Sequence, residues 1–283
     1  MILFEYLKLT APRITLLVMM TGFIGVWTGS RGTAQPALML WSLLGIGLAS
    51  AGASVFNNYY DRDIDRLMKR TCRRPLPSGR LNPNSALVFG ISLSVASFIL
   101  LAVFANFTSA ALAVLAIFIY SYIYTVVLKR KTHLATEIGG ISGALPPVIG
   151  WVAARGGLGV EAVILFSMMF LWQPAHFWSL AMRHRRDYLN AAIPTMPIVM
   201  SVKKTYTRSF FYISLLVLVS ALPYVTGMAG SAYLIVSVIS GSIFLLLSFY
   251  SMISARDLNR QIFCFSIIYL LLNFTTLAID LQG

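Results

Sequence analysis

Three oxygen-bearing side chains near the end of the second apolar stretch have the spacing of a metal site. Asn57, Asp61 and Asp65 are four residues apart, so on a continuous helix they lie on one face. Two carboxylates and an amide oxygen, each one turn apart, suit Mg²⁺, which takes oxygen ligands and shares them with substrate phosphates. We therefore predict that these three residues are catalytic and hold Mg²⁺ against a diphosphate. Asp63 lies off this face, and we interpret it as an ion-pair or capping residue.

Basic side chains accompany these acids. Seven Lys and Arg residues lie within 62–80, and a further basic run ends the fourth apolar stretch. Guanidinium and ammonium groups bind diphosphate oxygens and offset the charge that develops as diphosphate leaves. We expect Arg66, Lys69, Lys129 and Arg130 to bind the diphosphate. The alternative is a helix end at the membrane surface whose charges pair with one another and with lipid headgroups, with Lys129 and Arg130 as topology anchors.

A second polar segment follows the sixth apolar stretch. If it is one helix, His176, Arg183 and Asp187 lie within about 20° of one line. Asp187 can supply a ligand to a second Mg²⁺, so we count it among the catalytic and metal-binding residues, and Arg183 can bind diphosphate. His176 lies deeper, among aromatic residues. A lone histidine in such a helix is either a hydrogen-bonded packing residue or a group that faces a cavity.

These residues must be positioned by membrane helices. The 283 residues are 58% hydrophobic and 11% charged, with a mean hydropathy of +0.79, whereas roughly a quarter of the residues of a soluble domain are charged. A bilayer core needs about 20 mainly apolar residues per helix. On that basis we predict an all-α integral membrane protein with nine transmembrane helices, at approximately 13–29, 36–58, 84–105, 107–127, 136–154, 160–182, 208–226, 230–252 and 261–280.

The basic residues orient the nine predicted helices. With a cytoplasmic N-terminus, all of the 22 Lys and Arg residues except Arg31 and Arg155 fall in cytoplasmic segments, as the positive-inside rule requires. The C-terminus is then on the opposite side of the membrane. The two longest loops, about 59–83 and 183–207, are both cytoplasmic and lie over the predicted active site.

Net charge and cysteine content exclude several other classes of protein. A net charge of +13 in so apolar a chain indicates charged loops at an anionic bilayer face, and no soluble basic domain exists to bind nucleic acid. Cys72 and Cys264 predict no disulfide framework. We expect no cleavable signal peptide, and we expect residues 1–283 to form a single transmembrane domain.

The motif Asn57-x-x-x-Asp61-x-x-x-Asp65 resembles the first signature motif of the UbiA superfamily of intramembrane aromatic prenyltransferases, whose fold is a nine-helix bundle. The surrounding residues resemble more narrowly the haem O synthase subfamily, the protohaem IX farnesyltransferases. The matching stretches run along nearly the whole chain: Asn57-Asn58-Tyr59-Tyr60-Asp61, Arg70-Thr71, Arg74-Pro75-Leu76, Leu9-Thr10, Pro12-Arg13, Tyr124-Thr125, Leu128-Lys129-Arg130, Gly143-Ala144-Leu145-Pro146-Pro147, Gly150-Trp151, Phe263, Phe265-Ser266 and Tyr269-Leu270.

This resemblance implies an activity. A farnesyl group would pass from farnesyl diphosphate to a vinyl group of haem B, giving haem O and diphosphate, with Mg²⁺ as cofactor. It also implies that His176 is a haem-site residue, either an axial ligand or a hydrogen-bond partner near the reacting vinyl group. The protein is expected in the cell membrane with its active site facing the cytoplasm. Association with haem A synthase or terminal oxidase assembly is left open.

The sequence also departs from the family pattern. Where most superfamily members carry a second aspartate-rich motif, only Asp187 remains, and His133, Ala135 and Glu137 differ from the usual residues before helix five. Glu137 either pairs with a basic loop residue or contributes to the polar floor of the site. Two other functions stay open: a UbiA-type prenyltransferase for a quinone precursor such as a hydroxybenzoate or naphthoate, and a transporter of an anionic metabolite. The transporter predicts inverted repeats and polar groups at mid-membrane depth.

Overall fold

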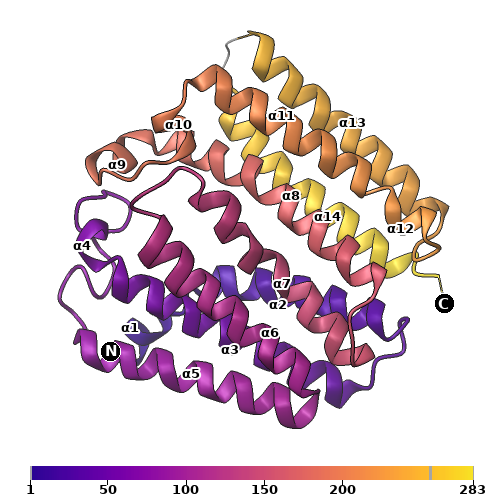
Figure 1. Ribbon diagram of the computed structural model, residues 1–283, viewed down its shortest axis with the longest axis horizontal. Helices are drawn as coiled ribbons and strands as arrows, with labels where there is room; N and C mark the ends of the chain where they lie inside the picture. The colour runs from indigo at the N-terminus through magenta and orange to yellow at the C-terminus, as the bar shows by residue number, and fades with distance from the viewer. Residues whose placement is uncertain (1, 255–256, 283) are drawn as a thin grey trace.

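The protein is an all-helical bundle (Figure 1). The computed structural model describes residues 2–254 and 257–282, so Arg256, one of the predicted cytoplasmic cations, lies outside it. Within the described ranges the only extended pairing is an isolated antiparallel bridge between Ala229 and Leu281. The predicted all-α class is confirmed.

A long helix corresponds to each of the nine predicted spans, and short helices connect them. The elements are α1 (Ile2–Leu9), α2 (Pro12–Gly29), α3 (Pro36–Tyr60), α4 (Arg62–Asp65), α5 (Pro83–Phe104), α6 (Phe107–Phe118), the π-helix η1 (Ile119–Leu128), α7 (Ala135–Arg155), α8 (Val160–Arg183), α9 (Arg185–Asn190), α10 (Met196–Val199), α11 (Val202–Val219), α12 (Leu222–Val225), α13 (Ser231–Ser254) and α14 (Asn259–Ile279).

Several of these helices are long and apolar enough to cross a membrane. Among the described residues seven qualify, and the pair α1 and α2, bent by 49°, makes eight if it is one span. The chain is therefore a multi-pass membrane protein. The predicted span at 136–154 forms helix α7 but is not among the seven or eight, so the count of nine stays a prediction.

Other helices surround most of helix α7. It lies between α2 and α8 in the middle of the bundle (Figure 1), and most of its residues are buried. Its crossing with α2 is very close: a Cβ on Gly25 would lie 1.9 Å from the carbonyl oxygen of Pro147, and one on Gly150 would lie 2.2 Å from that of Gly22. Backbones can approach this closely only where side chains are absent.

Local signals set the helix boundaries. The Asn82 side chain accepts a hydrogen bond from the Asn84 amide and so caps α5, and the Ser201 hydroxyl accepts one from the Lys204 amide and caps α11. Ser, Asn and Asp at this position satisfy amide groups that a helix start leaves unpaired. Because Ser201 caps α11, this helix begins at Val202, before the predicted span of about 208–226. The loop predicted at 183–207 is correspondingly shorter, and most of it is folded into α9 and α10.

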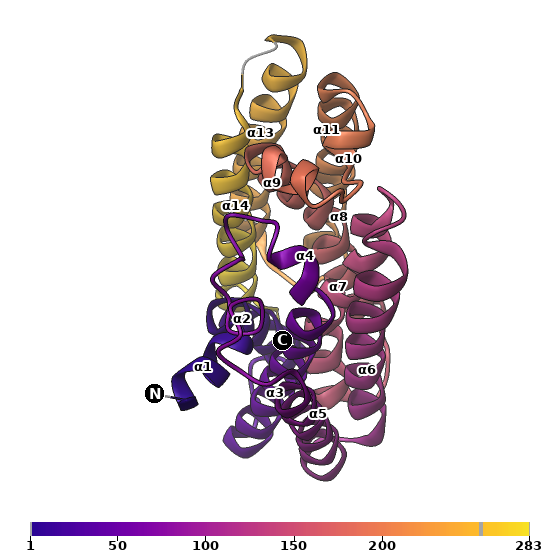
Figure 2. The same ribbon diagram turned by 90° about the vertical axis from the view of Figure 1, so that its left-hand side faces the viewer.

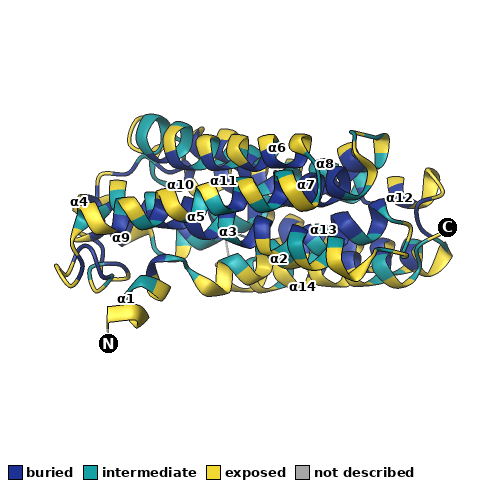
Figure 3. Cartoon of the chain, turned by 90° about the horizontal axis from the view of Figure 1, so that it is seen from below, coloured by how far each residue is buried: buried dark blue, intermediate teal, exposed yellow. Residues whose placement is uncertain are grey.

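The two ends of the bundle differ. Helices α1, α4 and α9 lie at one end, and the C-terminal end of α14 lies at the other (Figures 2 and 3). Exposed residues lie along the outer faces and buried ones face inward (Figure 3). Many of the exposed side chains on the long helices are large and apolar, as lipid contact requires. Helix α1 and the C-terminal end of α14 thus lie at opposite ends of the bundle, while the predicted placement of the two termini on opposite sides of the membrane stays a prediction.

Candidate functional site

The centre of the site is Asp61, at the end of α3. Its carboxylate is fully buried, and its Oδ2 accepts a hydrogen bond of 2.8 Å from the Asn57 Nδ2 and an ion pair from the Lys129 Nζ. Asn57 also donates to the Thr125 hydroxyl at 3.1 Å. The other oxygen, Oδ1 of Asp61, is buried and accepts no hydrogen bond from a described residue. An unpaired buried oxygen of this kind is costly unless something else binds it.

Helical spacing brings the acidic residues together, even though α3 ends at Tyr60. The Asp61 amide donates to the Asn57 carbonyl at 2.9 Å, and the Asp65 amide donates to the Asp61 carbonyl at 2.8 Å. These bonds continue the α-helical pattern across the junction of α3 and α4. Asn57, Asp61 and Asp65 therefore remain one turn apart, as the sequence spacing predicts.

Asp65 has a different cation from Asp61. Its side chain is buried, and its Oδ2 accepts a hydrogen bond of 2.8 Å from the Arg74 Nη1. The loop is tied to the same helical turn, because the Thr71 hydroxyl donates to the Asp65 carbonyl at 3.1 Å. In the sequence, Arg74 is marked only by the basic run at 62–80 and by the Arg74-Pro75-Leu76 match, neither of which identifies it as the partner of Asp65. We call Asn57, Asp61, Asp65, Arg74 and Lys129 the charged half-site.

A π-helix positions Lys129. The Lys129 amide donates to the Tyr124 carbonyl, five residues earlier, at 2.8 Å, which is the π-helical pattern. Tyr120 and Tyr124 stack within this helix with ring centroids 5.5 Å apart. The wider turn changes which side chains face α3, and it places both Thr125 and Lys129 against the Asn57 and Asp61 side chains. π-Helices are rare and are frequent at functional sites.

The remaining predicted diphosphate residues lie around the charged half-site. Arg130 makes a bidentate ion pair with Asp63, with both N–O distances 2.7 Å, and also donates to the Tyr60 carbonyl. This confirms the expected ion-pair role of Asp63, and Arg130 holds the pKa of that carboxyl below its usual value. Arg66 donates from Nε to the Pro77 carbonyl at 3.0 Å, and Lys69 is exposed.

Burial and the Lys129 charge change the pKa of Asp61 in opposite directions. Burial raises the pKa of Asp61 above the usual aspartate value, while the Lys129 ammonium acts to lower it. A separate, longer ion pair joins α11 to α7, where the Arg208 Nη1 is 3.5 Å from the Glu137 Oε1. Of the two roles expected for Glu137, the structure thus shows pairing with a basic residue, although that residue is in α11 and not in a loop.

His176 lies in a second group of residues, on α8 and α14. Its ring stacks between those of Trp172 and Phe263, with centroids 4.3 and 4.6 Å away. The His176 Nδ1 is 2.7 Å from the Ser266 hydroxyl, and the Trp172 indole donates to the Ser266 carbonyl at 2.7 Å. Arg183, at the end of α8, places its guanidinium 5.5 Å from the Phe263 ring centroid. We call Trp172, His176, Phe263 and Ser266 the aromatic half-site.

The sequence predicts that Asp187 lies on one helix face with His176 and Arg183, but the structure does not align them. The α8 helix ends at Arg183, His184 leaves helical geometry, and α9 begins at Arg185. Asp187 is largely buried as a residue, but its carboxylate has no hydrogen bond or ion pair with a described residue and is not closed off from the surface. The neighbouring Tyr188 hydroxyl accepts a bond of 3.3 Å from Arg70. No three His, Cys, Asp or Glu side chains in residues 2–254 and 257–282 form a group able to hold a metal ion. The structure thus does not bring Asp187 into one cluster with Asp61 and Asp65.

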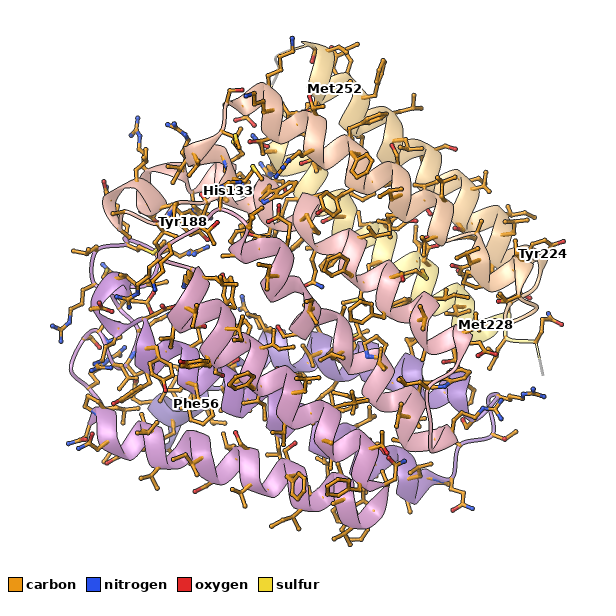
Figure 4. The ribbon with its side chains drawn as sticks, viewed as in Figure 1. Phe56, His133, Tyr188, Tyr224, Met228 and Met252 are labelled. Atoms are coloured by element: carbon orange, nitrogen blue, oxygen red, sulfur yellow. The ribbon has the colours of Figure 1, made fainter. Side chains whose placement is uncertain are left out.

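A small cleft lies between the π-helix and the α8–α10 segment. Its lining includes Tyr124, Lys129, His133, Phe177, Tyr188 and Thr195. Figure 4 shows Tyr188 and His133 close to the same end of the bundle, with Tyr224 and Met228 at the opposite end. The ion pairs of the described residues also involve helix ends and loops on the Tyr188 side. Polar chemistry is therefore concentrated at one end of the protein.

Comparison with known proteins identifies the family of this chain. Residues 18–273 match the model of the UbiA prenyltransferase family. The chain is 47% identical over 277 residues to the protohaem IX farnesyltransferase of Aquifex aeolicus, covering 98% of this chain and 95% of that protein.

Solved structures share the fold. A structure of digeranylgeranylglyceryl phosphate synthase superposes with a TM-score of 0.83 at 23% identity, covering 98% of both chains. A UbiA homologue from Archaeoglobus fulgidus, bound to DMAPP and Mg²⁺, gives a TM-score of 0.67 at 17% identity, covering 97% of this chain and 99% of that one. At these identities the likeness concerns the fold alone.

Proposed function

The chain belongs to the UbiA prenyltransferase family, and we propose that it transfers a farnesyl group from farnesyl diphosphate to a vinyl group of haem B, producing haem O and diphosphate. The observation that carries this proposal is the near-full-length similarity to a protohaem IX farnesyltransferase. The two half-sites provide the chemistry, because one is built for a charged group and the other for a flat aromatic one. Haem O then serves the biosynthesis of a haem-copper oxidase cofactor.

The charged half-site suits a diphosphate with Mg²⁺. The unpaired buried oxygen of Asp61 and the adjacent Asp65 carboxylate are hard oxygen donors of the kind Mg²⁺ prefers. Asn57, Asp61 and Asp65 would hold the ion, and Asp187 on α9, which lies outside that cluster, would supply a ligand to a second Mg²⁺. A Mg²⁺ ion held there would supply positive charge that offsets the charge of the leaving diphosphate.

Two cations already neutralise these carboxylates. Lys129 pairs with Asp61, and Arg74 pairs with Asp65. With the carboxylates engaged by a metal ion, Lys129 and Arg74 would be available to bind diphosphate oxygens. Arg66, Lys69, Arg130 and Arg183 would add positive charge around the leaving group.

The reaction replaces the C–O bond of farnesyl diphosphate with a C–C bond and adds water to the haem side chain. The C–O bond of farnesyl diphosphate breaks, with both electrons going to the diphosphate, and the vinyl π electrons of haem B form the new C–C bond. The carbocation left on the haem side chain takes up water and loses a proton to give the hydroxyl of haem O. The apolar bundle keeps water from the first, allylic cation.

The haem end of the site is the aromatic half-site, with His176 at its centre. Flat rings from Trp172 and Phe263 flank the imidazole. The Arg183 guanidinium beside Phe263 is placed to bind either a diphosphate or a haem propionate. We also propose that the whole chain acts as one domain. Association with haem A synthase or terminal oxidase assembly stays a prediction.

A direct assay tests the function. Purified protein in bilayers receives haem B, farnesyl diphosphate and Mg²⁺, and the product is identified by mass. We expect haem O, and we expect omission of Mg²⁺ to stop its formation. Geranyl and geranylgeranyl diphosphates, offered alone, measure the preference for chain length. Formation of a prenylated hydroxybenzoate or naphthoate, without haem O, would contradict the proposal.

We propose further that the protein lies in the cell membrane with the charged half-site facing the cytoplasm. Cys72 lies in the loop after α4 and is partly exposed, whereas Cys264 lies in α14. In a Cys264→Ser background, a membrane-impermeant maleimide should label Cys72 in inside-out vesicles and not in intact cells. Labelling from outside the cell would reverse the orientation.

A further inference from the structure

The His176 imidazole is fixed on both faces. Trp172, one turn earlier on α8, stacks at an interplanar angle of 22°, and Phe263 on α14 stacks at 28°. Two rings at centroid distances of 4.3 and 4.6 Å would overlap if they shared one face of so small a ring, so they cover opposite faces. Only the edge of the imidazole, with its two nitrogen atoms, is left for polar contacts.

Ser266 determines which nitrogen carries the proton. The Ser266 hydroxyl is 2.6 Å from the Phe263 carbonyl oxygen, and two oxygen acceptors lie this close only when a hydrogen lies between them. Since the hydroxyl has a single hydrogen, which it donates to that carbonyl, its oxygen accepts from the His176 Nδ1 at 2.7 Å. The hydrogen bonds therefore assign the proton to Nδ1 and a lone pair to Nε2.

The Nε2 atom is left without a protein partner. It forms no hydrogen bond with any residue that the structure describes, and it is not among the polar atoms that are both unpaired and closed off from the surface. A neutral imidazole whose Nδ1 is held by a hydrogen bond and whose Nε2 is open is the usual form of a metal-binding histidine. The second partner of such histidines orients the ring and makes the free nitrogen a better ligand.

The surroundings favour coordination over the alternatives. A vinyl group has no N–H or O–H to donate, so a lone pair on Nε2 cannot make a hydrogen bond to it. A general-base histidine is usually oriented by a carboxylate that stabilises the imidazolium, whereas the Nδ1 partner here is a neutral hydroxyl and the ring faces are aromatic. The iron of a porphyrin, by contrast, takes a neutral imidazole as its axial ligand.

We propose that His176 is an axial ligand of the haem B iron through Nε2, with Ser266 as the positioning residue that fixes the tautomer and ring orientation. This inference rests on the proposed function, because it requires haem to be the acceptor. Iron coordination would hold the porphyrin by its centre, leaving the vinyl groups at its edge free to react. It decides between the two roles that the sequence leaves open for His176.

The test measures haem binding separately from turnover. Ferric haem B is added to the purified chain in bilayers without farnesyl diphosphate, and the optical and paramagnetic resonance spectra are recorded. The wild type should show a histidine-ligated haem. His176→Gly should lose that ligation, and added imidazole should restore it by filling the vacated space. His176→Gln, which keeps the side-chain bulk, provides a second variant if the glycine variant does not fold.

Two further variants refine the result. Ser266→Ala should keep histidine ligation but weaken haem binding by roughly 10–100-fold, as loss of the outer partner of a metal-bound histidine does. His184→Ala is the matched control, because His184 lies at the α8–α9 break and has no place in the aromatic half-site. It should leave the haem spectrum unchanged.

The outcomes separate the two proposals. Histidine ligation that persists in both His176 variants would overturn the ligand assignment, and if haem O formation were lost at the same time, His176 would act as a proton acceptor instead. Histidine ligation that depends on His176, with no haem O formed by the wild type, would sustain this inference and contradict the proposed transferase reaction.

Discussion

The charged half-site and the aromatic half-site differ in the interactions that hold their polar side chains. The first pairs buried carboxylates with Lys129 and Arg74, whereas the second holds His176 with two ring stacks and one neutral hydrogen bond. Buried charges are costly unless they are compensated, and the proposed function has these cations exchanged for a metal ion and a diphosphate. The aromatic half-site has no charge to exchange and offers a rigid, flat surface.

The contrast between the half-sites suggests which of them determines the specificity for the acceptor substrate. In the proposed function, the charged half-site would contact only the Mg²⁺ and diphosphate that every prenyl diphosphate brings. The aromatic half-site would then select the acceptor. Changes in the charged half-site should therefore stop the reaction with every acceptor, while changes in the aromatic half-site should alter haem binding and leave the binding of prenyl diphosphate intact.

The largest effect is expected from the two buried aspartates. Asp61→Asn or Asp65→Asn removes a metal-binding charge while keeping the side-chain size, and each should lower kcat by about 10²–10³, the loss typical of one electrostatic group in a transition state. Haem B binding, measured optically, should stay unchanged. If both variants kept wild-type turnover, the charged half-site would not be the diphosphate site.

The next effect tests the scaffold that both half-sites share. Gly25→Ala places a Cβ 1.9 Å from the Pro147 carbonyl oxygen, which is backbone and cannot move alone. We expect α2 and α7 to separate, with a loss of about 3 kcal/mol in the free energy of unfolding, as for overpacked cores. Gly157→Ala is the control, because no atom lies within 4 Å of its Cβ. Thermal unfolding in detergent compares them, and equal stability of both variants would show that the close crossing is not required.

A smaller effect is expected at Arg74, the residue that the sequence did not single out. Arg74→Gln removes a charged hydrogen bond to Asp65, worth about 1.5–3 kcal/mol, and should raise the KM for farnesyl diphosphate roughly 10- to 100-fold. The haem spectrum should be unaffected. Steady-state kinetics with varied farnesyl diphosphate provide the measurement. An unchanged KM would mean that Arg74 serves only the folded loop.

The smallest effect is expected at Asp63, which is adjacent to the charged half-site in sequence but not part of it. Its side chain is 61% exposed and pairs with Arg130 at the surface. Exposed ion pairs contribute about 1 kcal/mol or less, so Asp63→Asn should change turnover and unfolding temperature only slightly. A loss comparable to that of the Asp61 variant would remove the distinction between the three aspartates.

Much of the site could be predicted from local spacing. The i, i+4, i+8 pattern of Asn57, Asp61 and Asp65 survives because backbone hydrogen bonds continue through the end of α3. The same reasoning was wrong for Asp187, because a helix break at His184 is not visible in a run that contains neither proline nor glycine. Periodicity predicts a shared face only as far as the helix extends.

The sequence by itself determined the membrane class, the helix positions and the acidic motif, because hydropathy and helical spacing are local properties. Only the tertiary structure decided the partners: Lys129 for Asp61 through a π-helix, Arg74 for Asp65, and Ser266 for His176 across 90 residues. Partners far apart in sequence meet only once the helices pack. Neither charge compensation nor the histidine tautomer could therefore be predicted from residue types alone.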